Sequence, residues 1–312
     1  MVGAGTISRY YGASLRKSPN LTLAAVADLN LERTKSYANE GITVYRDYRT
    51  LLEKAGVDAV IINLPNDIHF EACFAALNAG KHVCCEKPLT IHLDQALALA
   101  ETASKANLTL FTAFHRRYNR PVLELQRAVQ ARRHPIRHIQ ISYRENIRDH
   151  VGGDGWYLDP VRCGGGCIAD NGPNAFDTLA MFVPNYSVTQ ADIVFNADDI
   201  DRRATIWLEN PDGVTASVVL DWDYRNGEDK AVKISFDDGT VLAADMLAGF
   251  PAFKSSLFHE YDGVLADFSK SVRAGVGRGE QGINCVRLVT QSYSNMGGRN
   301  RSPSTWSSKT DV

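Results

Sequence analysis

Residues 58–88 read DAVIINLPNDIHFEACFAALNAGKHVCCEKP and decide the fold class. Residues 58–64 form a continuous apolar run, which is typical of a parallel strand buried on both faces. Residues 68–79 predict a helix that Gly80 ends, and residues 82–85 predict a second strand. A strand, a helix and a strand in this order predict one βαβ unit of a doubly wound, Rossmann-type parallel sheet.

The same alternation continues on both sides of this unit. Residues 50–55 predict a helix upstream, and a helix at about 93–106 and a strand at 109–114 follow downstream. Ligands of a doubly wound sheet bind beyond the carboxyl ends of its strands. The residues expected at those ends are Gly3, Asp28, Pro65, Asn66 and Lys87.

A glycine pair in the segment VGAGTIS, residues 2–8, precedes the predicted helices and strands. The first glycine permits a tight turn, the second lets the backbone approach a pyrophosphate, and the following helix offers its amide groups. Asp28 ends an apolar stretch where a carboxylate would bind ribose hydroxyls and repel a 2′-phosphate, which favours NAD over NADP. The glycine pair is a weak motif alone, and Asp28 could instead cap a helix at 31–33.

The chain resembles the Gfo/Idh/MocA oxidoreductases, the glucose-fructose oxidoreductase and inositol dehydrogenase family. The matching stretches are VGAGTIS, AAVADLN, LPNDIHFEACFAALNAGKHVCCEKPLT, FHRRYNRP and GWYLDPVRCGGGCIADNGPNAFD. The resemblance implies an NAD-binding Rossmann domain at 1–118, followed by an α/β domain at 119–295. It implies that the second domain has a large, open, mainly antiparallel sheet that commonly pairs subunits, and a last helix that returns to the first domain. It also implies that Lys87 faces the nicotinamide and the substrate, and it allows a cis peptide bond to Pro88.

A second cluster of polar residues lies in the stretch from 164 to 177. Gly172-Pro173 is typical of a helix start, so we expect Asp170 in the entry loop and Asn174 in the first turn. Many relatives have histidine where Asn174 stands. Asparagine orients a hydroxyl but takes no proton, so the acid/base work is expected at Lys87, assisted by Asp170. A similar arrangement occurs in relatives that oxidise aldoses at the anomeric carbon to lactones, although such residues are also frequent turn formers.

The predicted site residues fall into three groups. The predicted catalytic residues are Lys87, Asp170 and Asn174. The predicted cofactor-binding residues are Gly3, Gly5, Thr6, Ile7, Asp28, Pro65, Asn66, His69, Glu86 and Lys87. The predicted substrate-binding residues are Lys87, Arg116, Trp156, Tyr157, Asp170 and Asn174. A lone histidine such as His69 is more often structural, and aromatic residues before Asp-Pro more often pack.

Composition is that of a soluble cytoplasmic enzyme with two domains. The 312 residues carry a formal net charge of −2, which argues against nucleic acid as a partner. No apolar run is long enough to span a membrane, and no secretory segment is visible. The six cysteines lack paired metal-binding spacing, so neither zinc nor a disulfide is expected.

The second half of the chain predicts a sheet made largely of hairpins. Strands are expected at 137–145, 188–195, 204–209, 215–221 and 231–237, and helices at 261–274 and 283–293. Two departures from the family pattern stand out. Only Met1 and Val2 precede Gly3, so the first strand is predicted to be truncated, and residues 296–312 predict a flexible tail.

These observations predict an NAD-dependent dehydrogenase of a sugar or polyol, with Lys87 as the base. The family resemblance implies a homodimer or homotetramer formed through the second-domain sheet. Two other functions stay open. One is a sugar sensor that binds NAD without turnover, and the other is an NAD-dependent glycosidase or lyase.

Overall fold

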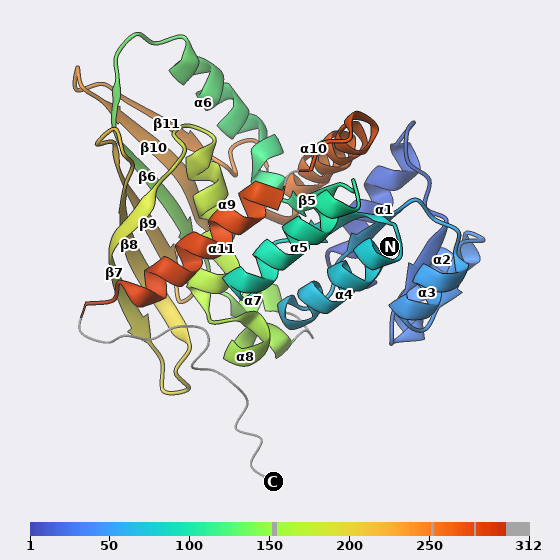
Figure 1. The fold of residues 1–312 in the computed structure, drawn as a ribbon. Coiled ribbons are helices and arrows are strands. Elements are labelled where there is room, and N and C mark those ends of the chain that lie inside the picture. The colour runs from blue at the N-terminus through green and yellow to red at the C-terminus, as the bar shows by residue number, and fades with distance from the viewer. Residues whose placement is uncertain (152–154, 251–252, 278, 298–312) are drawn as a thin grey trace. The chain divides into compact units, whose positions relative to one another are not determined.

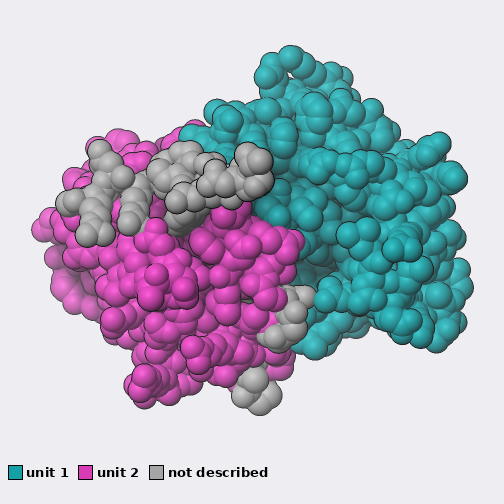
Figure 2. Space-filling view, turned by 90° about the horizontal axis from the view of Figure 1, so that it is seen from below, with its two compact units in different colours: residues 1–115, 257–283 teal, residues 116–256, 284–312 magenta. Residues whose placement is uncertain are grey.

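The computed structural model describes residues 1–151, 155–250, 253–277 and 279–297. The chain divides into two compact units, which Figure 2 colours teal and magenta. Unit 1 comprises Met1–His115 and Leu257–Ile283, and unit 2 comprises Arg116–Ser256 and the residues from Asn284 onward. All of the predicted tail beyond Gly297 lies outside the described residues.

Unit 1 is an alternation of strands and helices, as the sequence predicts (Figure 1). Its elements before residue 115 are α1 (Ser8–Lys17), β1 (Ala25–Ala27), η1 (Leu31–Thr34), α2 (Lys35–Asn39), β2 (Thr43–Tyr45), α3 (Tyr48–Lys54), β3 (Ala59–Ile62), α4 (Asn66–Asn78), β4 (His82–Glu86), α5 (Leu93–Lys105) and β5 (Leu110–Ala113). β1 pairs with β2, and β3, β4 and β5 pair in that order, all parallel. The doubly wound parallel fold is confirmed.

The first strand is reduced to a short segment around Val2. Val2 forms parallel bridges to Ala27 at the end of β1 and to Ile62 at the end of β3. Its amide nitrogen donates to Ile61 O at 2.8 Å, and its carbonyl oxygen accepts from Asn63 N at 2.8 Å. Residues 1–3, whose Met1 O and Gly3 N bond to Ala27 on β1, therefore join the β1–β2 pair to the β3–β4–β5 sheet.

Unit 2 contains a six-stranded sheet in the order β11-β10-β6-β9-β8-β7. Its strands are β6 (Ile136–Arg144), β7 (Ser187–Phe195), β8 (Asp201–Glu209), β9 (Thr215–Asp221), β10 (Asp229–Phe236) and β11 (Val241–Asp245). Only the β6–β9 pair is parallel among these strands, so the prediction of a mainly antiparallel sheet is confirmed. The sequence did not predict β11.

Helix α9 (Cys167–Ala180) covers one face of this sheet, where it packs on β6, β8 and β9 (Figure 1). The other helical elements from residue 115 onward are η2 (His115–Tyr118), α6 (Arg120–Gln130), α7 (Arg148–Val151), η3 (Gly155–Leu158), α8 (Pro160–Cys163), α10 (Phe253–Ala274) and α11 (Gly279–Ser294). None of the described helices is both long enough and apolar enough to cross a membrane. All six cysteines are buried thiols.

The predicted start of α9 at Gly172-Pro173 is wrong, because the helix begins at Cys167 and contains Pro173. The side chain of Asp201 explains the earlier start. Its carboxylate accepts hydrogen bonds from Gly166 N at 2.6 Å and Ile168 N at 2.8 Å, at the amino end of the helix. Asp170 consequently lies within the first turn rather than in an entry loop.

Candidate active site

The segment that carries Lys87 is buried except at this residue. Glu86 is the last residue of β4, and every side chain from Val83 to Thr90 is buried apart from Lys87, which is half-buried. The peptide bond between Lys87 and Pro88 is cis. The fold thus presents a single lysine from an otherwise closed turn at the carboxyl end of a parallel strand, where doubly wound sheets bind their ligands.

The Glu86 side chain faces the interior of unit 1. Its Oε1 atom accepts hydrogen bonds from Tyr11 Oη on α1 and from Tyr261 Oη on α10, both at 2.9 Å. Burial raises the pKa of Glu86, while the charge on Lys87 and the two hydroxyl groups act in the opposite direction. Tyr261 lies 175 positions from Glu86, and sequence reasoning missed both tyrosines because neither belongs to a motif.

His69 connects the turns that follow β3 and β4. The ring is fully buried, with Nδ1 at 2.7 Å from Pro88 O and Nε2 at 2.8 Å from Leu64 O. A neutral imidazole has one N–H group and can donate to only one of these oxygens at a time. Burial lowers the pKa of His69, and the two carbonyl oxygens act in the opposite direction. These contacts give His69 a structural role, and its predicted contact with the cofactor stays a prediction.

The glycine loop is tightly packed at Gly3. Gly3 has a φ of +87°, and a Cβ atom there would lie 2.5 Å from Asn63 O, so a larger residue would clash. Both polar atoms of the Asn63 side chain are buried without a hydrogen-bond partner among the described residues. The close approach at Gly3 is thus an internal contact with the backbone after β3, whereas the unpaired Asn63 amide fits a bound polar ligand. Asn63 belongs to no sequence motif and was not among the predicted site residues.

Asp28 holds the glycine loop against the end of β1. Its Oδ2 atom accepts from Ala4 N at 2.7 Å, and its Oδ1 atom accepts from Asn30 N at 2.8 Å. The helix-capping alternative is wrong, because Asn30, not Asp28, accepts from Glu32 N at the start of η1. Asp28 therefore shapes the loop, and its contact with a ribose stays a prediction.

Side chains from residues 257–283 hold the ends of β4 and β5 in place. Glu260 on α10 forms a buried hydrogen bond between its Oε2 atom and Nδ1 of His115 at 2.5 Å, and His115 follows β5. The next residue, Tyr261, stacks on the His115 ring at 5.6 Å between ring centroids and also donates to Glu86. Two consecutive side chains of α10 thus fix two strand ends of unit 1.

In unit 2, the predicted polar residues share one face of α9. Asp170, Asn174 and Asp177 are spaced four and three residues apart and are 5%, 2% and 1% exposed. Arg117 Nε lies 2.8 Å from Asp177 Oδ2, yet burial raises the pKa of Asp177 to about 6. The Oδ1 atom of Asn174 is buried and has no hydrogen-bond partner among the described residues. An unsatisfied buried acceptor of this kind fits a substrate hydroxyl that donates to it.

A buried charge cluster anchors α9 beside Asp170. Glu145 accepts from Asn171 Nδ2 at 3.0 Å and from the fully buried Lys230 Nζ at 2.5 Å. Burial raises the pKa of Glu145, but Lys230 and His150 outweigh it and lower that pKa to about 2. Glu145 is therefore ionised in the folded protein at neutral pH.

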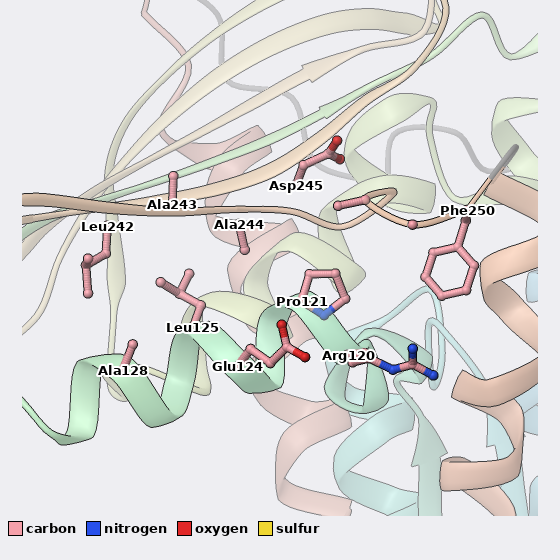
Figure 3. A pocket seen from close by; sticks show the side chains of 12 residues that line it. Arg120, Pro121, Glu124, Leu125, Ala128, Leu242, Ala243, Ala244, Asp245 and Phe250 are labelled. Carbon is pink, nitrogen blue, oxygen red and sulfur yellow. The ribbon is translucent and has the colours of Figure 1, made fainter.

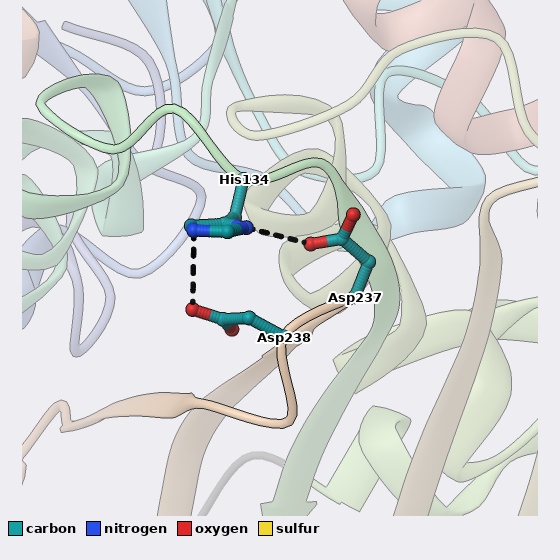
Figure 4. A group of neighbouring side chains, drawn as sticks. All are labelled: His134, Asp237 and Asp238. Atoms are coloured by element: carbon teal, nitrogen blue, oxygen red, sulfur yellow. Dashed lines mark hydrogen bonds and ion pairs between the residues drawn. The ribbon is translucent and has the colours of Figure 1, made fainter.

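Two groups of side chains among the described residues have the spacing of metal ligands. One is His134, Asp237 and Asp238, all exposed, with the imidazole between the two carboxylates (Figure 4). The other is Glu145, His150 and Glu228. Neither arrangement favours a metal. Asp238 already pairs with Arg132 at 2.8 Å, and the Lys230 ammonium bonds to both Glu145 and Glu228.

The other predicted substrate contacts occupy two different environments in unit 2. Arg116 is fully buried, where Nε donates to Tyr143 Oη at 3.3 Å. Trp156 and Tyr157 stack with ring centroids 3.8 Å apart and are half-buried. An aromatic pair of this kind can pack against the apolar face of a sugar ring. The substrate roles of these three residues stay predictions.

A pocket of about 440 Å³ opens between α6 and β11 (Figure 3). Its polar lining consists of Arg120, Glu124 and Asp245, and most of the remainder is small or apolar. None of the predicted site residues lines it. We therefore do not assign the predicted site residues to this pocket.

The family of the chain follows from comparison with known proteins. Residues 1–114 match an oxidoreductase family with an NAD-binding Rossmann fold, and residues 122–242 match the GFO/IDH/MocA C-terminal domain. The chain is 31% identical over 256 residues to myo-inositol 2-dehydrogenase of Thermotoga maritima, covering 78% of this chain and 74% of that protein. The chain belongs to the GFO/IDH/MocA oxidoreductase family.

Other relatives differ in the length they share with this GFO/IDH/MocA chain. D-xylose 1-dehydrogenase (NADP(+)) 2 of Haloferax volcanii is 29% identical over 243 residues, covering 77% of this chain and 73% of that protein. The match to the uncharacterized oxidoreductase YrbE of Bacillus subtilis, 28% identical over 193 residues, covers 61% of this chain and 54% of that protein. The chain thus spans about half the length of YrbE.

A solved structure shows the same fold as this GFO/IDH/MocA chain. GenD2 from gentamicin A biosynthesis, in complex with NAD, superposes with a TM-score of 0.86 at 18% identity, covering 94% of this chain and 92% of GenD2. The relatives thus include one named for NADP and one that holds NAD. These names support an NAD(P)-binding Rossmann fold for unit 1 and do not distinguish NAD from NADP.

Proposed function

We propose that this protein is an NAD(P)-dependent dehydrogenase that oxidises a hydroxyl group of a sugar or polyol, with Lys87 as the acid/base. The observation that carries the proposal is the half-buried Lys87, presented from a buried turn at a strand end in a fold with a glycine-loop cradle. The names of the relatives, inositol and xylose dehydrogenases, support the substrate class.

The proposed chemistry divides into a hydride and a proton. A bound nicotinamide would supply the acceptor for the hydride that leaves the substrate carbon. Lys87 Nζ takes the hydroxyl proton, so the carbon becomes a carbonyl carbon as the C–H and O–H bonds break. In the reverse direction, the Lys87 ammonium returns the proton to the carbonyl oxygen.

The residues of α9 bind and orient the substrate in this proposal. Asn174 Oδ1 accepts from a substrate hydroxyl, and Asp170 accepts from another. Because asparagine cannot take a proton, an acidic hydroxyl suits the site best. The anomeric hydroxyl of an aldose is such a group, so oxidation to a lactone is the finer proposal.

The cofactor and the assembly state complete the proposal. The negative charge of Asp28 at the end of β1 favours NAD over NADP. We expect the protein to be cytoplasmic and to form a homodimer or homotetramer through the sheet of unit 2. Size-exclusion chromatography with light scattering checks the assembly state.

A screen of purified protein tests the proposed function. Aldoses, polyols and inositols are offered with NAD and with NADP, and the absorbance of the reduced nicotinamide is followed. Reduction with at least one sugar or polyol supports the proposal. Tight sugar binding without reduction indicates a sensor, which the asparagine at position 174 would permit. Release of a cleaved product without net reduction indicates a glycosidase or lyase.

A further inference from the structure

The side-chain amide of Asn63 is unsatisfied at the carboxyl end of β3. The residue is half-buried, and its Nδ2 and Oδ1 atoms are both shielded from solvent without a hydrogen-bond partner among the described residues. No other side chain in the described part of the chain has two such atoms. Buried polar groups of native proteins almost always have partners, so an amide that lacks both an acceptor and a donor indicates a partner other than the protein's own groups.

Asn63 lies across from Gly3, where the first segment of the chain meets β3. Val2 pairs in parallel with Ile62, so the next residues of the two segments, Gly3 and Asn63, are neighbours. A Cβ atom at Gly3 would lie 2.5 Å from Asn63 O, which shows how closely the two backbones approach. The chain runs from the first segment to β1 and β2 on one side, and from β3 to β4 and β5 on the other. This is the switch point of a doubly wound sheet, across which dinucleotides bind.

The same register orders the predicted cofactor contacts along the strand ends. Asp28 follows β1 on one side of Gly3, and Lys87 follows β4 on the far side of Asn63. Neighbouring strands lie about 4.8 Å apart, so a molecule that reaches from Asp28 to Lys87 crosses three strand spacings, roughly 14 Å. It passes Gly3 first and Asn63 second. Asn63 therefore lies beside the part of a dinucleotide that joins the pyrophosphate to the nicotinamide, which is the second ribose.

We propose that Asn63 binds the ribose on the nicotinamide side of the cofactor. Its Oδ1 atom accepts from one ribose hydroxyl, and its Nδ2 group donates to an oxygen of the same ribose. A ribose diol offers both donors and acceptors, so it matches an amide that lacks both. The inference rests on the proposed function only in that Asp28 and Lys87 mark the adenosine and nicotinamide ends of the site. It needs no assignment of the sugar or of the proton transfer.

An unsatisfied amide predicts opposite effects on stability and on binding. Asn63→Leu removes an amide that makes no hydrogen bond within the described protein, so the ligand-free variant should melt at or above the temperature of wild type. The same change removes hydrogen bonds to the ribose, so ligands that contain this ribose should bind roughly tenfold more weakly. A merely structural asparagine gives the reverse pattern, in which the melting temperature falls and ligand binding is unchanged.

Isothermal titration calorimetry of the full-length protein with three ligands locates the contact without any substrate. ADP contains the adenosine ribose and the pyrophosphate, ADP-ribose adds the second ribose, and NAD adds the nicotinamide. Asn63→Leu should weaken the binding of ADP-ribose and NAD roughly tenfold and leave that of ADP within about twofold of wild type. Asn78→Leu, at an exposed asparagine that ends α4, is the control and should change none of the three affinities.

The ratio of ADP-ribose affinity to ADP affinity decides the matter, because a general distortion of the glycine loop would weaken both ligands alike. If Asn63→Leu does not fold, Asn63→Ala is compared with wild type by the same ratio. An unchanged ratio overturns the proposal, and so does failure of the wild type to bind any of the three ligands. A reduced ratio together with no turnover of any sugar by wild type upholds the inference and rejects the proposed function.

Discussion

Replacing Asp28 by asparagine should relax the preference for NAD while leaving the glycine loop in place. The carboxylate has two separate roles in the structure. Oδ2 accepts from Ala4 N at 2.7 Å and so holds the loop, and the negative charge would repel a 2′-phosphate. Asparagine keeps one acceptor oxygen for Ala4 N and removes the charge. Alanine removes both.

The two variants differ in expected size of effect. Two charges a few ångströms apart near a protein surface interact by about 1 to 4 kcal/mol, so Asp28→Asn should improve NADP binding relative to NAD by roughly tenfold or more. Asp28→Ala also loses the hydrogen bond to Ala4 N, for which about 1.5 to 3 kcal/mol is typical when the acceptor is charged. NAD binding should therefore weaken roughly tenfold or more in Asp28→Ala.

Isothermal titration calorimetry with NAD and NADP measures both effects. Glu53→Gln, an exposed carboxylate on α3, is the control for the loss of one negative charge. An NAD-to-NADP affinity ratio in Asp28→Asn equal to that of wild type would refute the electrostatic reasoning. Equal NAD affinity in Asp28→Asn and Asp28→Ala would show that the bond to Ala4 N does not hold the loop.

Three further predictions concern unit 2. Asn174→Ala should raise KM for the sugar and lower turnover less than loss of Lys87, because its proposed role is orientation; steady-state kinetics with the best sugar of the screen check this. Asp201→Asn should lower the free energy of unfolding by about 2 to 4 kcal/mol in urea titrations. The buried carboxylate accepts from Gly166 N, Ile168 N and Tyr293 Oη, and asparagine has fewer acceptor positions. An unchanged urea midpoint would contradict the role of Asp201 at the start of α9. The Glu145 pKa is about 2 in the folded protein, below its unfolded value. Its contribution to stability should therefore be fully present above about pH 4.5 and lost as the pH falls toward 2. A Glu145→Gln variant whose free energy of unfolding depends on acid pH as the wild type's does would refute this.

The local fold of unit 1 could be predicted because its signals are local. The strand and helix periods between residues 58 and 88 match β3, α4 and β4, whose burial follows from their continuous apolar runs. The edge strand β11 was missed because it is only five residues long and no side chain in it is buried, which leaves little apolar pattern. The start of α9 was misplaced because Asp201, far along the chain, supplies the acceptors that begin the helix.

The candidate site was predictable in its motifs and not in its supports. Glu86-Lys87-Pro88 is contiguous, so the sequence indicates it directly. The bond between Tyr261 and Glu86 joins residues 175 positions apart, and such a contact leaves no periodic or motif signal. Likewise, only the structure indicates Asn63 as a candidate binding residue, because both of its polar side-chain atoms are buried without partners among the described residues.

The turnover of Lys87→Ala tests the central claim most directly. The variant is compared with wild type and with Lys54→Ala, an exposed lysine at the end of α3, using the best sugar and saturating cofactor. We predict that Lys87→Ala binds the cofactor within about tenfold of wild type. Its turnover should be reduced by roughly a hundredfold or more, as expected for loss of a positioned acid/base group. Full turnover by Lys87→Ala would contradict the account.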